Sequence, residues 1–209
     1  MTTSSRRERE REEMRNRIIS AAAALMAQEG LQGLSIRRIA EKIDYSPAII
    51  YHYFKDKDDI LQMLMTRGHQ SILSALSQGD ALPEDPALRL TEMTKRYLQA
   101  ALSMPEEYLQ VQATGMPEVL HYTAMLFPGA ADKKPALRLL RDCVLAMHAH
   151  CPIPPEEAEL AAQLIASATL GLAIKLIVEK DIEESQRQRL IERFAQKAVI
   201  DFAKGANEP

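Results

Sequence analysis

The sequence predicts an all-α protein. Apolar residues recur every three or four positions through most of the 209 residues, and the alternating β-branched runs that mark strands do not appear. Proline and glycine divide these periodic stretches into segments of helical length. Hydrophobic residues make up 46% of the chain and charged residues 26%, which is typical of a folded globular protein.

The first two helices are expected within residues 18–43. Apolar residues from Ile18 to Met26 share one face of a helix that ends near Gly30, where a residue tolerant of positive φ is favoured. Alternating Arg and Glu over residues 6–17 extend this helix as a solvated arm, although an arm that touches a nucleic acid is the alternative. Ser35 is a good N-cap for a short second helix with the apolar stripe Ile36, Ile39, Ala40 and Ile43.

A third short helix follows after a tight turn. Ser46 is expected as its N-cap, and Pro47 stands at the first helical position, where its missing N–H is tolerated. Asp44 is expected to take the left-handed conformation that the turn needs. Two short helices joined by a three-residue turn and supported by a third form a helix-turn-helix, the motif that places a helix in the DNA major groove.

The rest of the chain is predicted as a second helical domain over residues 58–209, following a DNA-binding domain over 1–57. It begins with a connecting helix over 58–78, capped by Asp56. The glycine- and proline-rich stretch 79–86 is a loop. Further helices are expected near 87–103, 105–114, 117–126, 134–149, 156–179 and 184–204.

Charge is distributed unevenly between these two domains. Residues 1–57 hold eight Arg and three Lys against eight Asp and Glu, a net charge of +3, which leaves −6 for the remainder and −3 for the chain. This asymmetry hints at an electrostatic partner on one side only. The amino-terminal residues lack the apolar core of an export signal, and the apolar stretch 160–178 is interrupted by Gln163 and Lys175. We therefore expect a cytoplasmic protein without a membrane partner.

Catalytic, cofactor and metal sites are not expected. The sequence contains no nucleophile elbow, phosphate-binding glycine loop or His-Glu-x-x-His pair. Cys143, His148, His150 and Cys151 are metal-ligand types, but no third and fourth ligand stands at zinc-like spacing. Buried free cysteine is therefore favoured, and a metal sensor is the alternative.

The outward face of the third helix carries the side chains expected to read DNA. Ile49 can contact a thymine methyl group, and His52 can form a hydrogen bond with a base edge or a phosphate. An apolar side chain on a solvent-exposed face does not favour solubility. A role in binding DNA explains its presence beside a histidine better.

The segment GLQGLSIRRIAEKIDYSPAIIYHYFKDKDDIL, residues 30–61, resembles the DNA-binding signature of TetR-family transcriptional regulators. Met26 stands where the family usually has Phe, and Asp44 where the turn usually has Gly. The resemblance implies that Tyr51, Tyr53 and Lys57 contact phosphates and that Ser35, with Arg37 or Arg38, anchors the second helix to the DNA backbone. The predicted DNA-binding set is Ser35, Arg37, Arg38, Ser46, Pro47, Ala48, Ile49, Tyr51, His52, Tyr53 and Lys57.

Beyond residue 61 the resemblance is architectural. It suggests a helical ligand domain and a homodimer in which the last two helices form a four-helix bundle; the expected interface residues are Leu164, Ser167, Gly171, Leu172, Leu190, Phe194 and Phe202. Soft and aromatic side chains between residues 93 and 147 suit an adaptable ligand pocket, and they suit a protein core equally well. The candidates are Met93, Tyr97, Tyr108, Met116, His121, Tyr122, Met125 and Met147.

These observations predict a dimeric repressor that binds a palindromic operator in double-stranded DNA and leaves it when a small molecule binds the carboxy-terminal domain. One alternative is a helical ligand carrier or enzyme on a regulator-like scaffold that binds no operator. Another is a module that uses the charged amino-terminal helix to bind a protein or a membrane surface.

Overall fold

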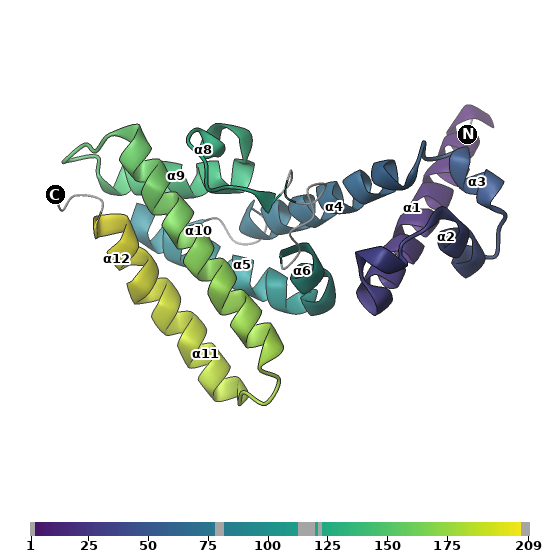
Figure 1. The fold of residues 1–209 in the computed structure, drawn as a ribbon. Helices are drawn as coiled ribbons and strands as arrows, with labels where there is room; N and C mark the ends of the chain where they lie inside the picture. Colours follow the sequence, from purple (N-terminus) through teal and green to yellow (C-terminus); the bar gives the residue numbers. More distant parts are fainter. Residues whose placement is uncertain (1–2, 78–81, 113–119, 121–122, 206–209) are drawn as a thin grey trace. The chain divides into compact units, whose positions relative to one another are not determined.

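The computed structural model describes residues 3–77, 82–112, 120 and 123–205 (Figure 1). All regular secondary structure within these residues is helical, which confirms the predicted fold class. Contacts divide the chain into two compact units. The first comprises Met1–His69 with Glu106–Tyr122, and the second comprises Gln70–Pro105 with Thr123–Pro209.

The first unit is built on α1 (Thr3–Glu29), which is followed by a 3₁₀ turn (Leu31–Gly33), α2 (Ile36–Ile43) and α3 (Pro47–Tyr51). The apolar stripes predicted for these helices converge in one core. It contains Ile18, Ile19, Ala22, Leu25, Leu34, Ile39, Ala40, Ile43, Ile50, Phe54 and Ile60, none of them more than 4% exposed. The core fixes the two short helices against the longer one.

The helix α4 (Lys57–Ser77) begins one residue before the predicted connecting helix. Its start is capped as expected: the Asp59 N–H donates to Asp56 Oδ1 at 2.9 Å, and the Asp59 carboxylate accepts from the Lys55 N–H at 3.0 Å. The first unit nevertheless extends past the predicted boundary at residue 57. Buried Leu61 and Met65 of α4 pack against Met26, so the first turns of α4 belong to this unit together with part of α6 (Pro105–Gln112).

The second unit has α5 (Pro86–Ser103) at its centre, packed against α9 (Pro135–Met147), α10 (Pro155–Val178) and α12 (Val199–Lys204). Its remaining helices are α8 (Ala130–Lys133) and α11 (Glu184–Arg193), and a π-helical turn over Phe194–Ala198 joins α11 to α12. Leu90, Met93, Val144, Ile165 and Val199 form the centre of the core.

Two predicted segments differ from the structure. Half of the expected helix 117–126 lies outside the described residues, and residues 124–126 are not helical. The four-residue helix α8 was not predicted. It begins after Gly129, whose φ of +75° favours glycine, and it is held from a distance: the Ala130 N–H donates to Glu159 Oε1 at 2.7 Å. Such a short helix depends on this long-range bond more than on its own sequence.

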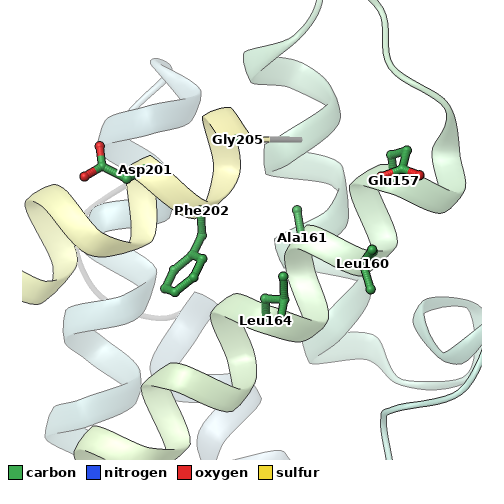
Figure 2. Close-up of a pocket in the computed structure, with 7 residues that line it drawn as sticks. All are labelled: Glu157, Leu160, Ala161, Leu164, Asp201, Phe202 and Gly205. Atoms are coloured by element: carbon green, nitrogen blue, oxygen red, sulfur yellow. The ribbon is translucent and has the colours of Figure 1, made fainter. Parts of the chain in front are cut away.

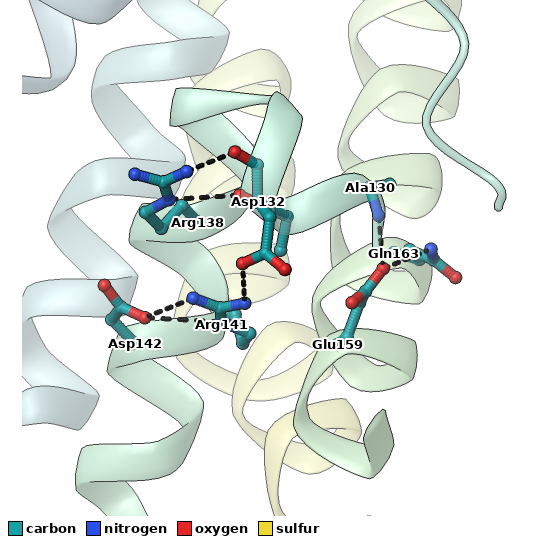
Figure 3. A network of polar contacts seen from close by, with 8 residues as sticks. Ala130, Asp132, Arg138, Arg141, Asp142, Glu159 and Gln163 are labelled. Carbon is teal, nitrogen blue, oxygen red and sulfur yellow. Dashed lines mark hydrogen bonds and ion pairs between the residues drawn. The ribbon is translucent and has the colours of Figure 1, made fainter. Parts of the chain in front are cut away.

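Polar contacts attach the segment before α8 to α10 (Figure 3). Gln163, only 9% exposed, donates from Nε2 to the Phe127 carbonyl at 3.1 Å and to Glu159 Oε1 at 3.3 Å. On the neighbouring helix, Arg141 donates to Asp132 Oδ1 at 2.8 Å. The amide nitrogen of this buried side chain therefore has its hydrogen-bond partners within the protein.

The π-helical turn explains an unusual period in the last helix. The buried residues Ile191, Ala195, Val199 and Ala203 are spaced four apart. Over these twelve residues an α-helix of 3.6 residues per turn would rotate the stripe by about 120° away from the core. A wider π turn offsets this drift, so the stripe stays on one side of the helix.

The helix α10 is long and apolar enough, by length and composition alone, to cross a membrane, with a mean hydropathy of 1.8 over its best window. Some apolar residues of α10 pack in the interior of the second unit, where Ala162 and Ile165 are fully buried. Other apolar residues of the same helix, including Leu160 and Leu164, are about half exposed.

Candidate nucleic-acid interface

The turn between α2 and α3 has the predicted backbone geometry. Asp44 adopts φ 61° and ψ 47°, the left-handed conformation. Its N–H donates to the Glu41 carbonyl at 3.2 Å, and the Tyr45 N–H donates to the Ala40 carbonyl at 2.9 Å. These two bonds form a Schellman motif, which satisfies carbonyls at the end of α2 and sends the chain sharply toward α3.

The two short helices begin at the expected residues. Ser35 caps α2, since its hydroxyl oxygen accepts the Arg38 N–H at 3.3 Å. Ser46 precedes α3 with an extended backbone, but its side chain makes no capping bond. The helix α3 ends at Tyr51, and His52 after it keeps right-handed helical angles of φ −73° and ψ −18°.

The outward face of α3 is accessible. Ser46, Pro47, Ala48 and His52 are exposed, and Ile49 is half-buried. Tyr51 is 58% exposed, so its ring is not used in the core. An aromatic side chain presented this far outward suits a contact outside the domain.

Tyr53 differs from Tyr51 in its surroundings. Its side chain is half-buried and packs against the core of the first unit. Packing in the core therefore explains the position of the Tyr53 ring, independently of any contact that its hydroxyl makes. Lys57, also half-buried, is the first residue of α4.

The two neighbouring arginines of α2 have different partners. The Arg37 side chain is 82% exposed and pairs at 2.9 Å with Glu41, an exposed contact that a phosphate can replace. Arg38 instead donates to both carboxylate oxygens of Glu29 and to the Gly33 carbonyl at 3.3 Å. The Arg38 hydrogen bond holds the pKa of the Glu29 carboxyl below its usual value. Of the two arginines, Arg37 has the more exposed side chain and fewer partners.

Two arginines that the sequence interpretation placed on a solvated arm make contacts inside the domain. Arg15 Nη1 donates to the Tyr53 carbonyl at 2.8 Å, and Arg17 Nη2 donates to the Ile43 carbonyl at 3.2 Å. Arg15 is half-buried and Arg17 stays exposed, so these contacts add to the predicted solvated arm without removing it from solvent. Their partners lie 38 and 26 positions away in the sequence, so the local charge pattern gave no signal of them.

The predicted ligand-binding residues are not gathered around one described cavity. Met93, Tyr97 and Met147 belong to the main core of the second unit, and Met125 packs near α8. Tyr108 is buried in the first unit. Met116, His121 and Tyr122 lie outside the described residues.

An open pocket of about 460 Å³ lies between α10 and α12, away from those candidates (Figure 2). Phe202 and Leu164 project toward each other across it. The residues that line it are Glu157, Leu160, Ala161, Leu164, Asp201, Phe202 and Gly205.

The metal-ligand residue types are also dispersed. Among the described residues, no three His, Cys, Asp or Glu side chains are arranged to hold a metal ion. Cys143 is buried, and this burial raises the pKa of its thiol. His148 is buried as well, with Nδ1 at 2.9 Å from the Val144 carbonyl of its own helix.

The predicted dimer residues fall into two groups. Leu164, Leu190 and Phe202 are 37–49% exposed, and Gly171 is exposed with open space where a Cβ would stand. The others are half-buried: Ser167 and Leu172 on α10, and Phe194, which packs against the core of the second unit. The π turn that begins at Phe194 accompanies this inward placement.

Comparison with known proteins connects the helix-turn-helix to a family. Residues 18–64 match the family model of bacterial regulatory proteins, tetR family. The HTH-type transcriptional regulator HbdR of Aromatoleum is 48% identical over 50 residues, which span 24% of this chain and only 22% of that relative. The regulator BetI of Ectopseudomonas mendocina is 26% identical over 185 residues, covering 85% of this chain and 88% of the relative.

Solved structures extend the likeness to nearly the whole chain at the level of fold. A bacterial regulatory protein of the tetR family from Rhodococcus superposes with a TM-score of 0.64 at 20% identity, covering 89% of this chain and 95% of that one. The fatty acid degradation regulator FadR of Bacillus halodurans superposes with a TM-score of 0.63 at 16% identity, covering 93% and 97%. The sequence match identifies residues 18–64, within α1 to α4, as a domain of the tetR family of bacterial regulatory proteins, and the solved structures show that nearly the whole chain shares the fold of such regulators.

Proposed function

We propose that this protein is a dimeric repressor that binds a palindromic operator in the cytoplasm and releases it when a small molecule binds the second unit. The observation that carries the proposal is α3: a short helix anchored by buried Ile50 and Phe54, with Tyr51 and His52 directed outward. A helix held this way can enter a major groove while its supports stay outside it.

The exposed residues divide into two proposed roles. Tyr51, Arg37 and Lys57, with Ser35 and the Tyr53 hydroxyl, contact phosphates, which set the register and supply most of the salt-dependent affinity. Ile49 and His52 contact base edges, each worth roughly 1–3 kcal/mol of discrimination. Ser46, Pro47 and Ala48 lie at the start of α3, the end that approaches the groove first. Arg38 is not proposed as a phosphate contact, because its guanidinium already forms an ion pair with the Glu29 carboxylate.

The proposed dimer buries the exposed apolar side chains of α10 and α12. Leu160, Leu164 and Phe202 line the open pocket (Figure 2), and Leu190 of α11 is a further exposed apolar side chain. Apolar side chains exposed together on one face of a folded unit are typical of an interface. A second copy of this face would cover them by a two-fold axis, as in most homodimers.

The effector site is proposed within the second unit. Met93, Tyr97 and Met147 share one core there, and methionine side chains can repack around an apolar ligand at small cost. An effector acts only through a difference in its affinity for the DNA-binding and released states. The relatives and structural neighbours are transcriptional regulators rather than enzymes, so no catalytic role is proposed.

In vitro selection tests the proposal. Duplexes that bind the purified protein are selected from random DNA at about 50 and 200 mM salt. The Tyr51→Phe and His52→Ala variants go through the same selection. We expect a palindrome for the wild type, weaker binding to every sequence for Tyr51→Phe, and relaxed base preference for His52→Ala. Sequence-independent retention, or none, by the wild type would contradict operator binding. It would favour the alternative, a ligand carrier on the same scaffold.

A further inference from the structure

Three consecutive residues of α1 each bind a different element of the first unit. Arg15 contacts the segment after α3, Arg17 contacts the end of α2, and Asn16 between them accepts a hydrogen bond from Arg67 of α4. Successive residues of an α-helix point about 100° apart, so one turn of α1 reaches three neighbours. We infer that Arg15 and Arg17 are positioning residues that set the orientation of α3 for operator recognition.

Arg15 fixes the exit from α3. Its guanidinium donates to the Tyr53 carbonyl at 2.8 Å and lies 4.5 Å from the centre of the buried Phe54 ring. A planar guanidinium can make a hydrogen bond and a cation–π contact at once. Tyr53 follows α3 by two residues, so this contact fastens its carboxy-terminal side.

Arg17 fixes the entry to α3. It donates to the Ile43 carbonyl at 3.2 Å and lies over the Tyr45 ring, 5.4 Å from its centre. The Ile43 carbonyl belongs to the last residue of α2, where carbonyls lack helical partners and the helix dipole favours a cation. Both connections of α3 are thus held by charged donors on one rigid helix.

Because each guanidinium already donates a hydrogen bond to a backbone carbonyl of the first unit, its proposed role differs from that of a phosphate contact. A lost phosphate contact weakens binding to all sequences and reduces the slope of log affinity against log salt by about 0.9. A lost positioning contact displaces α3 and weakens its base contacts most, while the proposed phosphate contacts of Ser35, Arg37 and Lys57, which lie outside α3, are kept. Arg11, one turn before Arg15, provides a matched control, because it is exposed and forms no ion pair within the described part of the chain.

The inference rests on the proposed operator binding, and its test compares the selected palindrome with a scrambled duplex of equal length. Fluorescence anisotropy is measured from about 50 to 200 mM salt for Arg15→Gln, Arg17→Gln and Arg11→Gln. We expect the first two to lose about tenfold or more in operator affinity, with a much smaller loss on the scrambled duplex and a salt slope equal to that of Arg11→Gln. Arg11→Gln keeps the wild-type ratio of the two affinities. Equal losses on both duplexes with a reduced slope, or wild-type binding by Arg17→Gln, would overturn the inference.

A conservative variant and a measurement without DNA separate positioning from folding. Arg17→Lys keeps the charge, but lysine cannot stack on the Tyr45 ring and donate to the Ile43 carbonyl at the same time. We therefore expect it to restore only part of the ratio of operator affinity to scrambled-duplex affinity. Amide hydrogen exchange in Arg17→Gln is expected to quicken over residues 45–53 while Ala22 stays protected. Uniform quickening would mean global destabilisation and contradict a local role. If the wild type selects no sequence, operator binding fails, and the exchange experiment still decides whether Arg17 holds α3.

Discussion

Replacing Asp44 tests whether the left-handed turn limits the stability of the first unit. An L-residue in this conformation costs roughly 1–2 kcal/mol, and less for Asp than for most others. Its φ of 61° and ψ of 47° place Asp44 well inside that region. We expect Asp44→Gly to raise the free energy of unfolding by about 0.5–1 kcal/mol, after subtracting the larger chain entropy that glycine loses on folding. Asp44→Ala is expected to lower it by a similar amount.

Thermal unfolding followed by circular dichroism checks these values. For a unit of this size, the glycine variant should melt roughly 2–8 °C higher in the transition of the first unit. Asp44→Asn is the matched control, because asparagine tolerates the same backbone and keeps the shape. Both Asp44→Asn and Asp44→Gly remove one negative charge, so both should bind duplex DNA more tightly at low salt. Equal stability of the alanine and aspartate forms would refute the argument from backbone strain.

Three further predictions concern other parts of the chain. A thiol reagent should modify exposed Cys151 quickly and Cys143 only on unfolding, because burial blocks access and raises the pKa of the Cys143 thiol. Arg38→Met should return the pKa of Glu29 toward its usual 4.5 in a carboxyl NMR titration. Since Glu29 has a depressed pKa when folded, the stability it contributes is present above pH 4.5 and lost as pH falls through the folded pKa. Phe202→Asp should shift the proposed dimer toward monomer in sedimentation experiments, because it places a charge on the apolar pocket.

Matched variants keep these tests specific. Leu126→Asp changes a leucine that is 72% exposed elsewhere in the second unit, and it should leave the dimer intact. Equal dissociation by both variants would argue against the proposed interface. In Cys151→Ser, rapid labelling of the folded protein should disappear. An unchanged Glu29 titration in Arg38→Met would mean that Arg38 does not control that carboxyl.

Elements with local signals were predicted well from the sequence. The caps at Ser35 and Asp56 and the stripe on α2 depend on residues three or four apart, and all three are present. The left-handed Asp44 was predicted because the turn length demanded it. These interactions form within one or two helical turns, so the chain needs no distant partner to specify them.

Features that depend on tertiary packing were missed. The π turn follows from how the four-residue stripe of the last helix meets the core, and α8 depends on a bond to Glu159, which is 29 residues away. The candidate site was incomplete for the same reason. The partners of Arg15 and Arg17 become neighbours only once α2 and α3 fold onto α1.

The central claim is that two copies of α3 occupy successive major grooves on one side of the DNA. Inserting five base pairs at the centre of the selected palindrome tests it most directly, because half a helical turn moves one half-site to the opposite side. The claim predicts that the protein binds this duplex no better than a single half-site. Undiminished affinity for the lengthened duplex would contradict it.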